Sequence, residues 1–296
     1  MTQVSALLEK QRDRSTAAAL ELAGLTELMS LTPGRPEVCV ALIDGPVAAH
    51  PDLSDADVRV LPADPPVAQP DSAACRHGTF VAGMLWARGD SAAPAICPGC
   101  SFVVRPVLGH PMPVATPETL AAALIDCVDA GARIVNLSAA AGTPLPDRER
   151  EVEQALDYAA RRGVIVIAAA GNQGWVGSSA VTRHPGVIPV TACDLAGRPL
   201  RDANVSGTIG RRGLAAPGAD ISSLNAGGGT VSWSGTSVAA PFVTGAAALL
   251  WSLFPRAPSE HVRLALLQPF PQRRATVFPP MLNARTAYGQ MIAGHA

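Results

Sequence analysis

Short runs of apolar and β-branched residues recur along the chain and contain few polar positions. Uninterrupted runs of about four to eight residues are typical of strands that are buried on both faces of a parallel sheet. These runs predict five strands, at residues 38–43, 101–107, 133–137, 164–170 and 187–192.

Segments with helical periodicity lie between several of these runs. One helix is predicted to begin after Thr116, which can cap it, with Pro117 in its first position and Gly131 at its end. A second helix spans residues 147–162, with acidic residues early and arginines late. The alternation of strands and helices predicts an α/β fold with a doubly wound, mostly parallel central sheet and helices on both faces.

The most apolar segment covers residues 238–254. Its length is close to the shortest that spans a membrane, about 17 residues. However, Pro241 and Gly245 interrupt it, and small residues dominate its first half. We therefore predict a fully buried helix, from Ser237 or just before it to about Leu253, and no membrane span.

The first 36 residues form a separate short segment ahead of the first predicted strand. Apolar residues at helical spacing predict a surface helix over residues 17–29. Charged residues are spread through the first 30 positions, without the basic and then apolar regions of a secretion signal. We expect a helical N-terminal extension (residues 1–36), one large domain (residues 37–296) and a cytoplasmic location.

Composition narrows the classes of partner. The chain of 296 residues is 48% hydrophobic and 16% charged, with a net charge of −1. Such a sequence has ample apolar surface to bury and offers no strong field to hold nucleic acid or an anionic membrane surface. We expect neither as a partner.

The chain has six cysteines, of which Cys97 and Cys100 are spaced as Cys-Pro-Gly-Cys. This spacing occurs in redox pairs and in half-sites for zinc. No second pair or histidines follow at ligand spacing, and the motif precedes a predicted strand rather than opening a helix. The third interpretation, a Pro-Gly turn flanked by two thiols, is favoured. We predict no metal site and no cofactor.

Polar residues follow several of the predicted strands. Asp44 ends the first strand, Ser138 follows the third, and Asn172 follows the fourth. His77 lies in a polar segment, residues 76–79, that leads into a further predicted helix, and Ser237 opens the apolar helix. Because ligands of open parallel sheets bind beyond the carboxyl ends of the strands, we expect these side chains to converge.

These residue types suit nucleophilic catalysis. A serine hydroxyl needs an adjacent base, a histidine can be that base, and a buried carboxylate can orient the imidazole. A backbone N–H at a helix N-terminus and an asparagine amide can stabilise an oxyanion. Asp44 precedes His77 by 33 residues, and His77 precedes Ser237 by 160. The order Asp, His, Ser is that of subtilisin.

With these residues in this order, the chain resembles the subtilisin-like serine proteases, peptidase family S8. The resemblance rests on VALIDG, HGTFVAGML, IVNLS, AAAGN, LAAPGADI and SGTSVAAPFVTGAAALL. It implies a three-layer sandwich and a peptidase domain over residues 37–296. It also implies that Ser237 is the nucleophile, His77 the general base and Asp44 the orienting acid. Asn172 and the Ser237 N–H would form the oxyanion hole.

The resemblance implies two substrate-binding segments. They are Ser138, Ala139 and Ala140 on one wall, and Ala169, Ala170 and Gly171 on the other. Relatives commonly have glycine at the position of Ala140, so we expect its Cβ to narrow the adjoining subsite. Relatives also commonly have histidine at the position of Phe80, a departure with no evident catalytic consequence.

The segment LTPGRPEVCVALIDGPVAAHPDL resembles the start of the proteases that mature cyanobactin-type ribosomal peptides. That group contains proteases that cleave a precursor and macrocyclases with a helical cap between the Asp and His motifs. The 33-residue separation leaves no room for such a cap. We therefore favour an endopeptidase acting on a peptide or protein, such as a ribosomal precursor peptide. The alternatives are a peptide ligase and a catalytically silent fold that binds peptides.

Overall fold

A seven-stranded sheet forms the centre of the protein. The computed structural model describes residues 14–53, 57–63, 72–108, 115–138, 146–267 and 276–295. The strands of this sheet are β1 (Cys39–Asp44), β2 (Val58–Val60), β3 (Ser101–Pro106), β4 (Ile134–Leu137), β5 (Ile165–Ala169), β6 (Val187–Cys193) and β7 (Leu214–Pro217). They lie in the order β2-β3-β1-β4-β5-β6-β7, and every neighbouring pair is parallel. The predicted doubly wound parallel sheet is confirmed.

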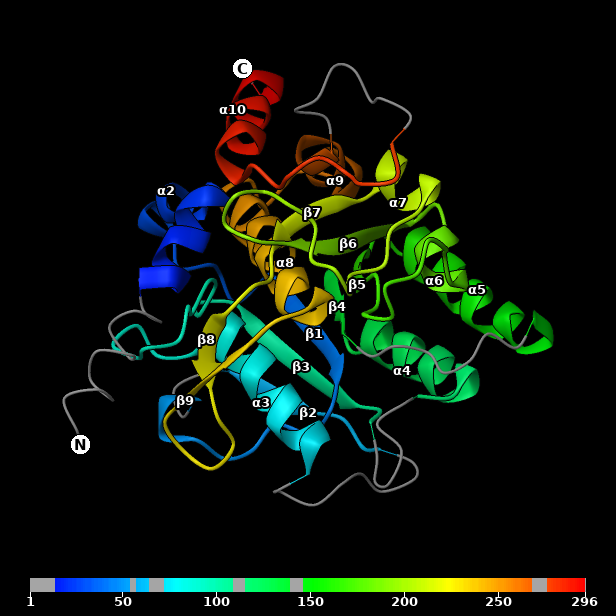
Figure 1. Cartoon of the computed structure of the whole chain (residues 1–296), viewed down its shortest axis with the longest axis horizontal. Coiled ribbons are helices and arrows are strands. Elements are labelled where there is room, and N and C mark those ends of the chain that lie inside the picture. Colours follow the sequence, from blue (N-terminus) through cyan, green and yellow to red (C-terminus); the bar gives the residue numbers. More distant parts are fainter. Residues whose placement is uncertain are drawn as a thin grey trace.

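Helices cover both faces of this sheet (Figure 1). One face carries α2 (Leu25–Leu31), α3 (Ala73–Trp86), α8 (Thr236–Leu253), α9 (Ser259–Leu267) and α10 (Ala284–His295). The other face carries α4 (Pro117–Asp129), α5 (Pro146–Arg161) and α6 (Ala180–Arg183). The short helix α7 (Gly207–Arg212) precedes β7, and an antiparallel hairpin of β8 (Ile221–Leu224) and β9 (Thr230–Trp233) leads into α8.

Successive residues of the strands enter opposite cores. Val40 and Leu42 of β1 pack in the core that contains α3 and α8, whereas Ala41 and Ile43 pack in the core that contains α4 and α5. Since side chains alternate along a strand, a strand with a core on each face is apolar at every position. This double burial explains the uninterrupted apolar runs in the sequence.

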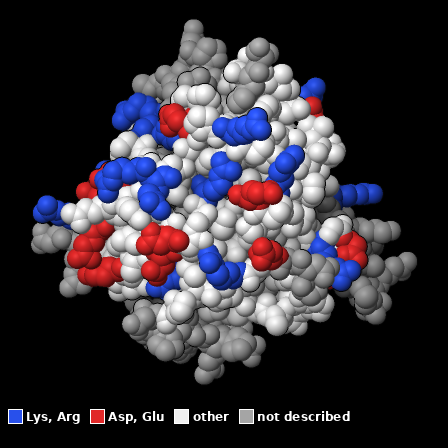
Figure 2. Space-filling model, turned by 180° about the vertical axis from the view of Figure 1, so that it is seen from behind, with Lys and Arg blue, Asp and Glu red and all other residues white. Residues whose placement is uncertain are grey.

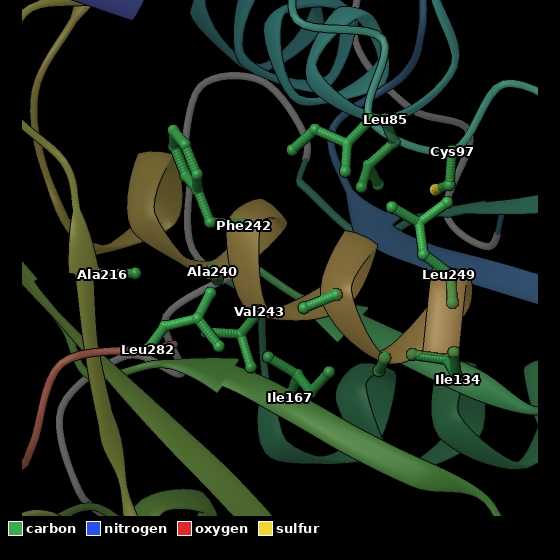
Figure 3. Close-up of a cluster of buried hydrophobic side chains, with 14 of the residues drawn as sticks. Leu85, Cys97, Ile134, Ile167, Ala216, Ala240, Phe242, Val243, Leu249 and Leu282 are labelled. Atoms are coloured by element: carbon green, nitrogen blue, oxygen red, sulfur yellow. The ribbon is translucent and has the colours of Figure 1, made fainter. Parts of the chain in front are cut away.

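Helix α8 crosses one of these cores beside the sheet. All of its side chains except those of Ser237 and Leu253 are buried. Figure 3 shows Val243 of this helix near Ile167 of β5. By length and composition α8 could cross a membrane, but 89% of the helix is buried inside the protein. The prediction of a buried helix is confirmed.

The helix predicted over residues 17–29 is interrupted. Residues 14–22 are helical, a turn follows, and α2 begins at Leu25. Gly24 has a φ of 69°, which glycine adopts without strain, and it ends the first helix. Figure 1 shows α2 beside the C-terminal helix α10, and the Ala284 N–H donates to the Ala23 carbonyl at 2.9 Å.

Cys97 and Cys100 flank a tight turn. The Cys100 N–H donates to the Cys97 carbonyl at 3.1 Å, and the Gly99 N–H donates to the Pro33 carbonyl at 2.8 Å. Both thiols are buried and free. In the part of the chain that the structure describes, no three His, Cys, Asp or Glu side chains are grouped to hold a metal ion. The geometry favours a turn that ties the N-terminal segment to the fold.

Charges of both signs are interspersed on the surface. Figure 2 shows basic and acidic side chains next to one another on the face opposite to that of Figure 1. Two of the ion pairs are Arg183 with Glu149 at 2.6 Å and Arg263 with Glu260 at 3.3 Å. This mixing agrees with the small net charge of the chain.

Candidate active site

Asp44 and His77 come from two elements that meet at the carboxyl edge of the sheet. Asp44 is the last residue of β1 and is fully buried, and His77 lies in the second turn of α3. Asp44 Oδ1 and His77 Nδ1 are 2.6 Å apart. The expectation that His77 precedes its helix is wrong. Ser72 caps the helix one residue before Ala73 by accepting a hydrogen bond from a backbone N–H of the first turn.

Two glycines let α3 approach the end of β1. A Cβ on Gly45 would lie 1.9 Å from the carbonyl oxygen of Ala74, and a Cβ on Gly78 would lie 2.4 Å from the carbonyl oxygen of Gly45. Neither backbone leaves room for a side chain. A larger residue at either position would therefore push α3 away from β1 and separate His77 from Asp44.

Ser237 is presented by the first turn of α8. Gly235 precedes the helix with a φ of 141°, and Ser237 is the second helical residue. Its Oγ lies 2.8 Å from Nε2 of His77. Backbone N–H groups in the first turn have no intrahelical acceptor, and the helix dipole adds positive potential there. The Ser237 N–H can therefore donate to a developing oxyanion.

The environment of His77 suits a base. Burial lowers the pKa of His77, but the charge of Asp44 and its hydrogen bond raise it more, so the pKa lies above its usual value. Asp44 Oδ1 also accepts the N–H of Gly45 at 2.6 Å, and Asp44 Oδ2 has no hydrogen-bond partner among the described residues. A carboxylate at Nδ1 favours the neutral tautomer that carries its proton there, and in that tautomer Nε2 can accept a proton from Ser237.

Asn172 lies beside the start of α8. Its Oδ1 accepts a hydrogen bond from the Thr236 N–H at 2.8 Å. Gly171, with a φ of 101°, donates its N–H to Thr236 Oγ1 at 3.1 Å. The Asn172 Nδ2 lies 3.1 Å from the position that a Cβ on Gly235 would take. The amide is thus oriented at the same helix end as the Ser237 N–H, as a pair of oxyanion donors requires.

Asn204 holds the loop that carries Asn172, and the sequence did not predict it. Its Oδ1 accepts the N–H groups of Gln173 at 3.1 Å and Trp175 at 2.9 Å. Its Nδ2 donates to the Ala170 carbonyl at 3.0 Å and to the Gln173 side chain at 2.7 Å. No local pattern signals a contact made across so many residues.

The predicted walls of the site meet at one cleft of about 610 Å³. Ser138, Ala169 and Gly171 line it, but Ala170 does not. The Ala170 N–H instead donates to the carbonyl of Val190 in β6 at 2.9 Å. Ala139 and Ala140 lie outside the described residues. The narrowed subsite therefore stays a prediction.

A buried polar chain supports Ser138 from beneath the cleft. Asn136 donates from Nδ2 to Ser138 Oγ at 2.7 Å, and its Oδ1 accepts the Thr244 hydroxyl at 2.8 Å. All three side chains are buried. Because Thr244 belongs to α8, these hydrogen bonds join β4 to the helix that carries Ser237.

Trp233 forms a wall of the cleft that the sequence analysis missed. It is the last residue of β9 and is stacked on the rings of His77 and Phe80. Phe80, which had no assigned consequence, is therefore in contact with a residue of the site. The only signal in the sequence is an aromatic residue shortly before the SGTS motif.

Comparison with known proteins identifies the family. The sequence model of the Peptidase S8 subtilase family matches residues 35–289. The chain belongs to the subtilase family. This family consists of subtilisin-like serine peptidases, as the motifs implied.

Among subtilases, Subtilisin BL from Lederbergia lenta is 32% identical over 215 residues, which cover 72% of this chain and 76% of the relative. Fervidolysin from Fervidobacterium pennivorans is 28% identical over 282 residues, which cover 83% of this chain and 39% of the relative. The chain thus corresponds to well under half of the length of Fervidolysin.

Solved structures include maturation proteases. A mutant of the protease domain of PatA has a TM-score of 0.82 and 34% identity, covering 90% of this chain and 98% of that one. The prenylagaramide maturation protease PagA has a TM-score of 0.80 and 31% identity, with the same coverage. The resemblance to cyanobactin maturation proteases is confirmed. The PatG macrocyclase domain, at 22% identity and a TM-score of 0.80, shares the fold.

Proposed function

We propose that the chain is an endopeptidase in which Ser237 is the nucleophile, His77 the general base and Asp44 the orienting acid. The observation that carries this proposal is the continuous set of hydrogen bonds from Asp44 through His77 to Ser237. Asn172 and the Ser237 N–H would hold the oxyanion.

The reaction follows from these positions. Ser237 Oγ attacks the scissile carbonyl carbon as its proton passes to His77 Nε2. His77 returns that proton to the amine nitrogen as the C–N bond breaks, and leaves an acyl group on Ser237. A water molecule, deprotonated by His77, then releases the carboxylic acid and restores the serine.

The proposed substrate is a peptide, and in particular a ribosomal precursor peptide. Two structures similar to the chain at more than 30% identity are PatA and PagA, each called a maturation protease. We favour hydrolysis over cyclisation. The reason is the segment between Asp44 and His77, where the macrocyclases of the group carry a helical cap. Its described residues contain a short 3-10 helix (Pro51–Leu53), β2 and the first residues of α3.

Mass spectrometry of peptide digests tests this proposal. The purified chain is incubated with a pool of unstructured linear peptides, next to Ser237→Ala and to Ser30→Ala, a change on the exposed surface of α2. We expect linear fragments whose masses sum to the substrate plus one water, from the wild type and Ser30→Ala only. A product one water lighter than the corresponding linear fragment would indicate cyclisation by ligation. Tight peptide binding without turnover would indicate a silent fold.

A further inference from the structure

Trp233 contacts the helix that carries the base. Its ring is stacked on that of His77 with centroids 5.5 Å apart and an interplanar angle of 27°. It is also stacked on Phe80, with centroids 4.9 Å apart and an angle of 17°. Because His77 and Phe80 lie one turn apart on the same face of α3, one indole contacts both rings.

The β8–β9 hairpin fixes the indole in this place. Ser223 of β8 donates its hydroxyl to the Phe80 carbonyl at 2.7 Å. Gly83 of α3 lies so close to the hairpin that a Cβ on it would be 2.5 Å from Ser223 Oγ. Phe80 is fully buried. Trp233 is therefore held both through its own strand and through its ring partner.

The same hairpin leads directly to the nucleophile. After Trp233, the Ser234 hydroxyl accepts the Asp220 N–H at 2.9 Å, and the Gly235 N–H donates to the Gly218 carbonyl at 2.8 Å. The chain then enters α8 at Thr236. Trp233 thus joins the segment that presents Ser237 to the helix that presents His77.

We propose that Trp233 is a positioning residue for His77, through which the hairpin keeps the imidazole aligned between Asp44 and Ser237. This inference rests on the proposed function, in which His77 accepts the Ser237 proton. Rotation of the imidazole about its side-chain bonds would take Nε2 away from Ser237, and the stacked indole packs against one face of the ring. An aromatic face also stabilises the imidazolium that forms on proton transfer.

Steady-state kinetics of three variants test this role. Trp233→Leu keeps an apolar side chain without a ring, and Trp233→Phe keeps a ring. We expect Trp233→Leu to lower kcat about tenfold, or about 1.4 kcal/mol in activation free energy. The loss in kcat should exceed any change in KM, because the ring contact with His77 is lost in addition to part of the cleft wall. Trp233→Phe should recover most of the loss, and Phe80→Leu should give a smaller loss of the same kind.

Two controls make the outcome decisive. Active sites are counted by titration with a fluorophosphonate, so that kcat refers to folded enzyme, and Ser237→Ala is assayed in parallel. Full activity in Ser237→Ala would overturn the proposed function and this inference with it. With Ser237→Ala inactive, three results overturn the inference alone: wild-type kcat in Trp233→Leu, a loss confined to KM, or equal losses in Trp233→Leu and Trp233→Phe.

Discussion

His77 contacts a carboxylate at Nδ1, a hydroxyl at Nε2 and an indole through its ring. Asp44 raises the pKa of the imidazole through its charge and its hydrogen bond, and the Ser237 hydroxyl lies within hydrogen-bond distance of Nε2. Trp233 covers part of the ring. The sequence predicted the first two partners because both lie in motifs, but a ring contact between two elements leaves no periodic signal.

The raised pKa of His77 predicts the pH dependence of kcat/KM. Only the neutral imidazole accepts a proton, so activity should fall as the pH drops through the pKa of His77. We expect this acid limb above pH 6.5, about the pKa of an unperturbed histidine. A wild-type limb at or below that value would contradict the assignment.

Asp44→Asn isolates the part played by the carboxylate. The acid limb should move to lower pH, because the charge that raises the pKa is gone. In subtilisin, a relative of this chain, removing the equivalent aspartate lowers kcat roughly 3 × 10⁴-fold, and we expect the same order here. The pH profile of this variant checks both statements, and an unmoved limb would argue against Asp44 as the source of the shift.

At the scale of elements, the site depends on the close approach of α3 to β1. By intrinsic helix propensity alone, Gly78→Ala should stabilise α3 by about 1 kcal/mol. We nevertheless expect it to destabilise the protein by about 1–3 kcal/mol, since the added Cβ meets backbone atoms of Gly45. It should also lower kcat, because His77 is displaced from Asp44.

Gly89→Ala is the matched control. A Cβ on Gly89 meets no atom within 4 Å, so melting temperature and kcat should stay near wild type. Thermal melting and kinetics of both variants provide the comparison. A Gly78→Ala protein as active and as stable as Gly89→Ala would show that the approach of the two elements is unimportant.

The loop of Asn172 depends on Asn204. Asn204→Ala removes four hydrogen bonds from this loop, so the side chain of Asn172, the proposed oxyanion donor, should lose its fixed position. We expect kcat to fall about tenfold, less than the roughly 10²–10³-fold cost of removing an oxyanion donor outright, a figure that itself comes from subtilisin. KM should change little. Asn225→Ala, in the turn between β8 and β9, is the control, and equal kcat in the two variants would refute the role of Asn204.

Elements with a long apolar run or a clear cap were predictable, and several shorter ones were not. The cap of α4 at Thr116 and the burial of α8 follow from local sequence, and the structure has both. β2 and β9 were not predicted, because they are short and only partly buried and so carry no apolar run. β7 and β8 were not predicted either, because their sequences LAAP and ISSL are short and hold no run of β-branched residues, although both strands are buried. The start of α3 ahead of His77 was not predicted, because its capping residue, Ser72, lies in a Pro-rich stretch.

At the scale of the molecule, low charge and high apolar content reflect two cores on either side of one sheet. The sheet order places the carboxyl ends of β1 and β4 next to each other. The chain continues from β1 toward one edge of the sheet and from β4 toward the other edge. Ligands of such folds bind in the crevice between two strands of this kind, at their carboxyl ends. The convergence of Asp44 and Ser138 was predictable from this rule, whereas the supporting contacts of Asn204 and Trp233 required coordinates.

Metal independence is a prediction for the whole fold. The part of the chain that the structure describes has no grouped ligands for a metal ion, and Asp52 Oδ2 instead accepts the Ser91 hydroxyl at 2.7 Å. We expect the same melting temperature with a chelator and with added calcium. A marked fall in melting temperature on chelation would reveal a site in this fold.

The central claim is that Ser237 is the activated nucleophile. Intact-protein mass spectrometry after reaction with a fluorophosphonate tests it most directly, since the reagent needs both an activated serine and a base. We predict one adduct per folded wild-type chain, located on Ser237, and none on Ser237→Ala. A folded wild type that stays unlabelled, or a Ser237→Ala variant that still takes up one adduct, would contradict the account.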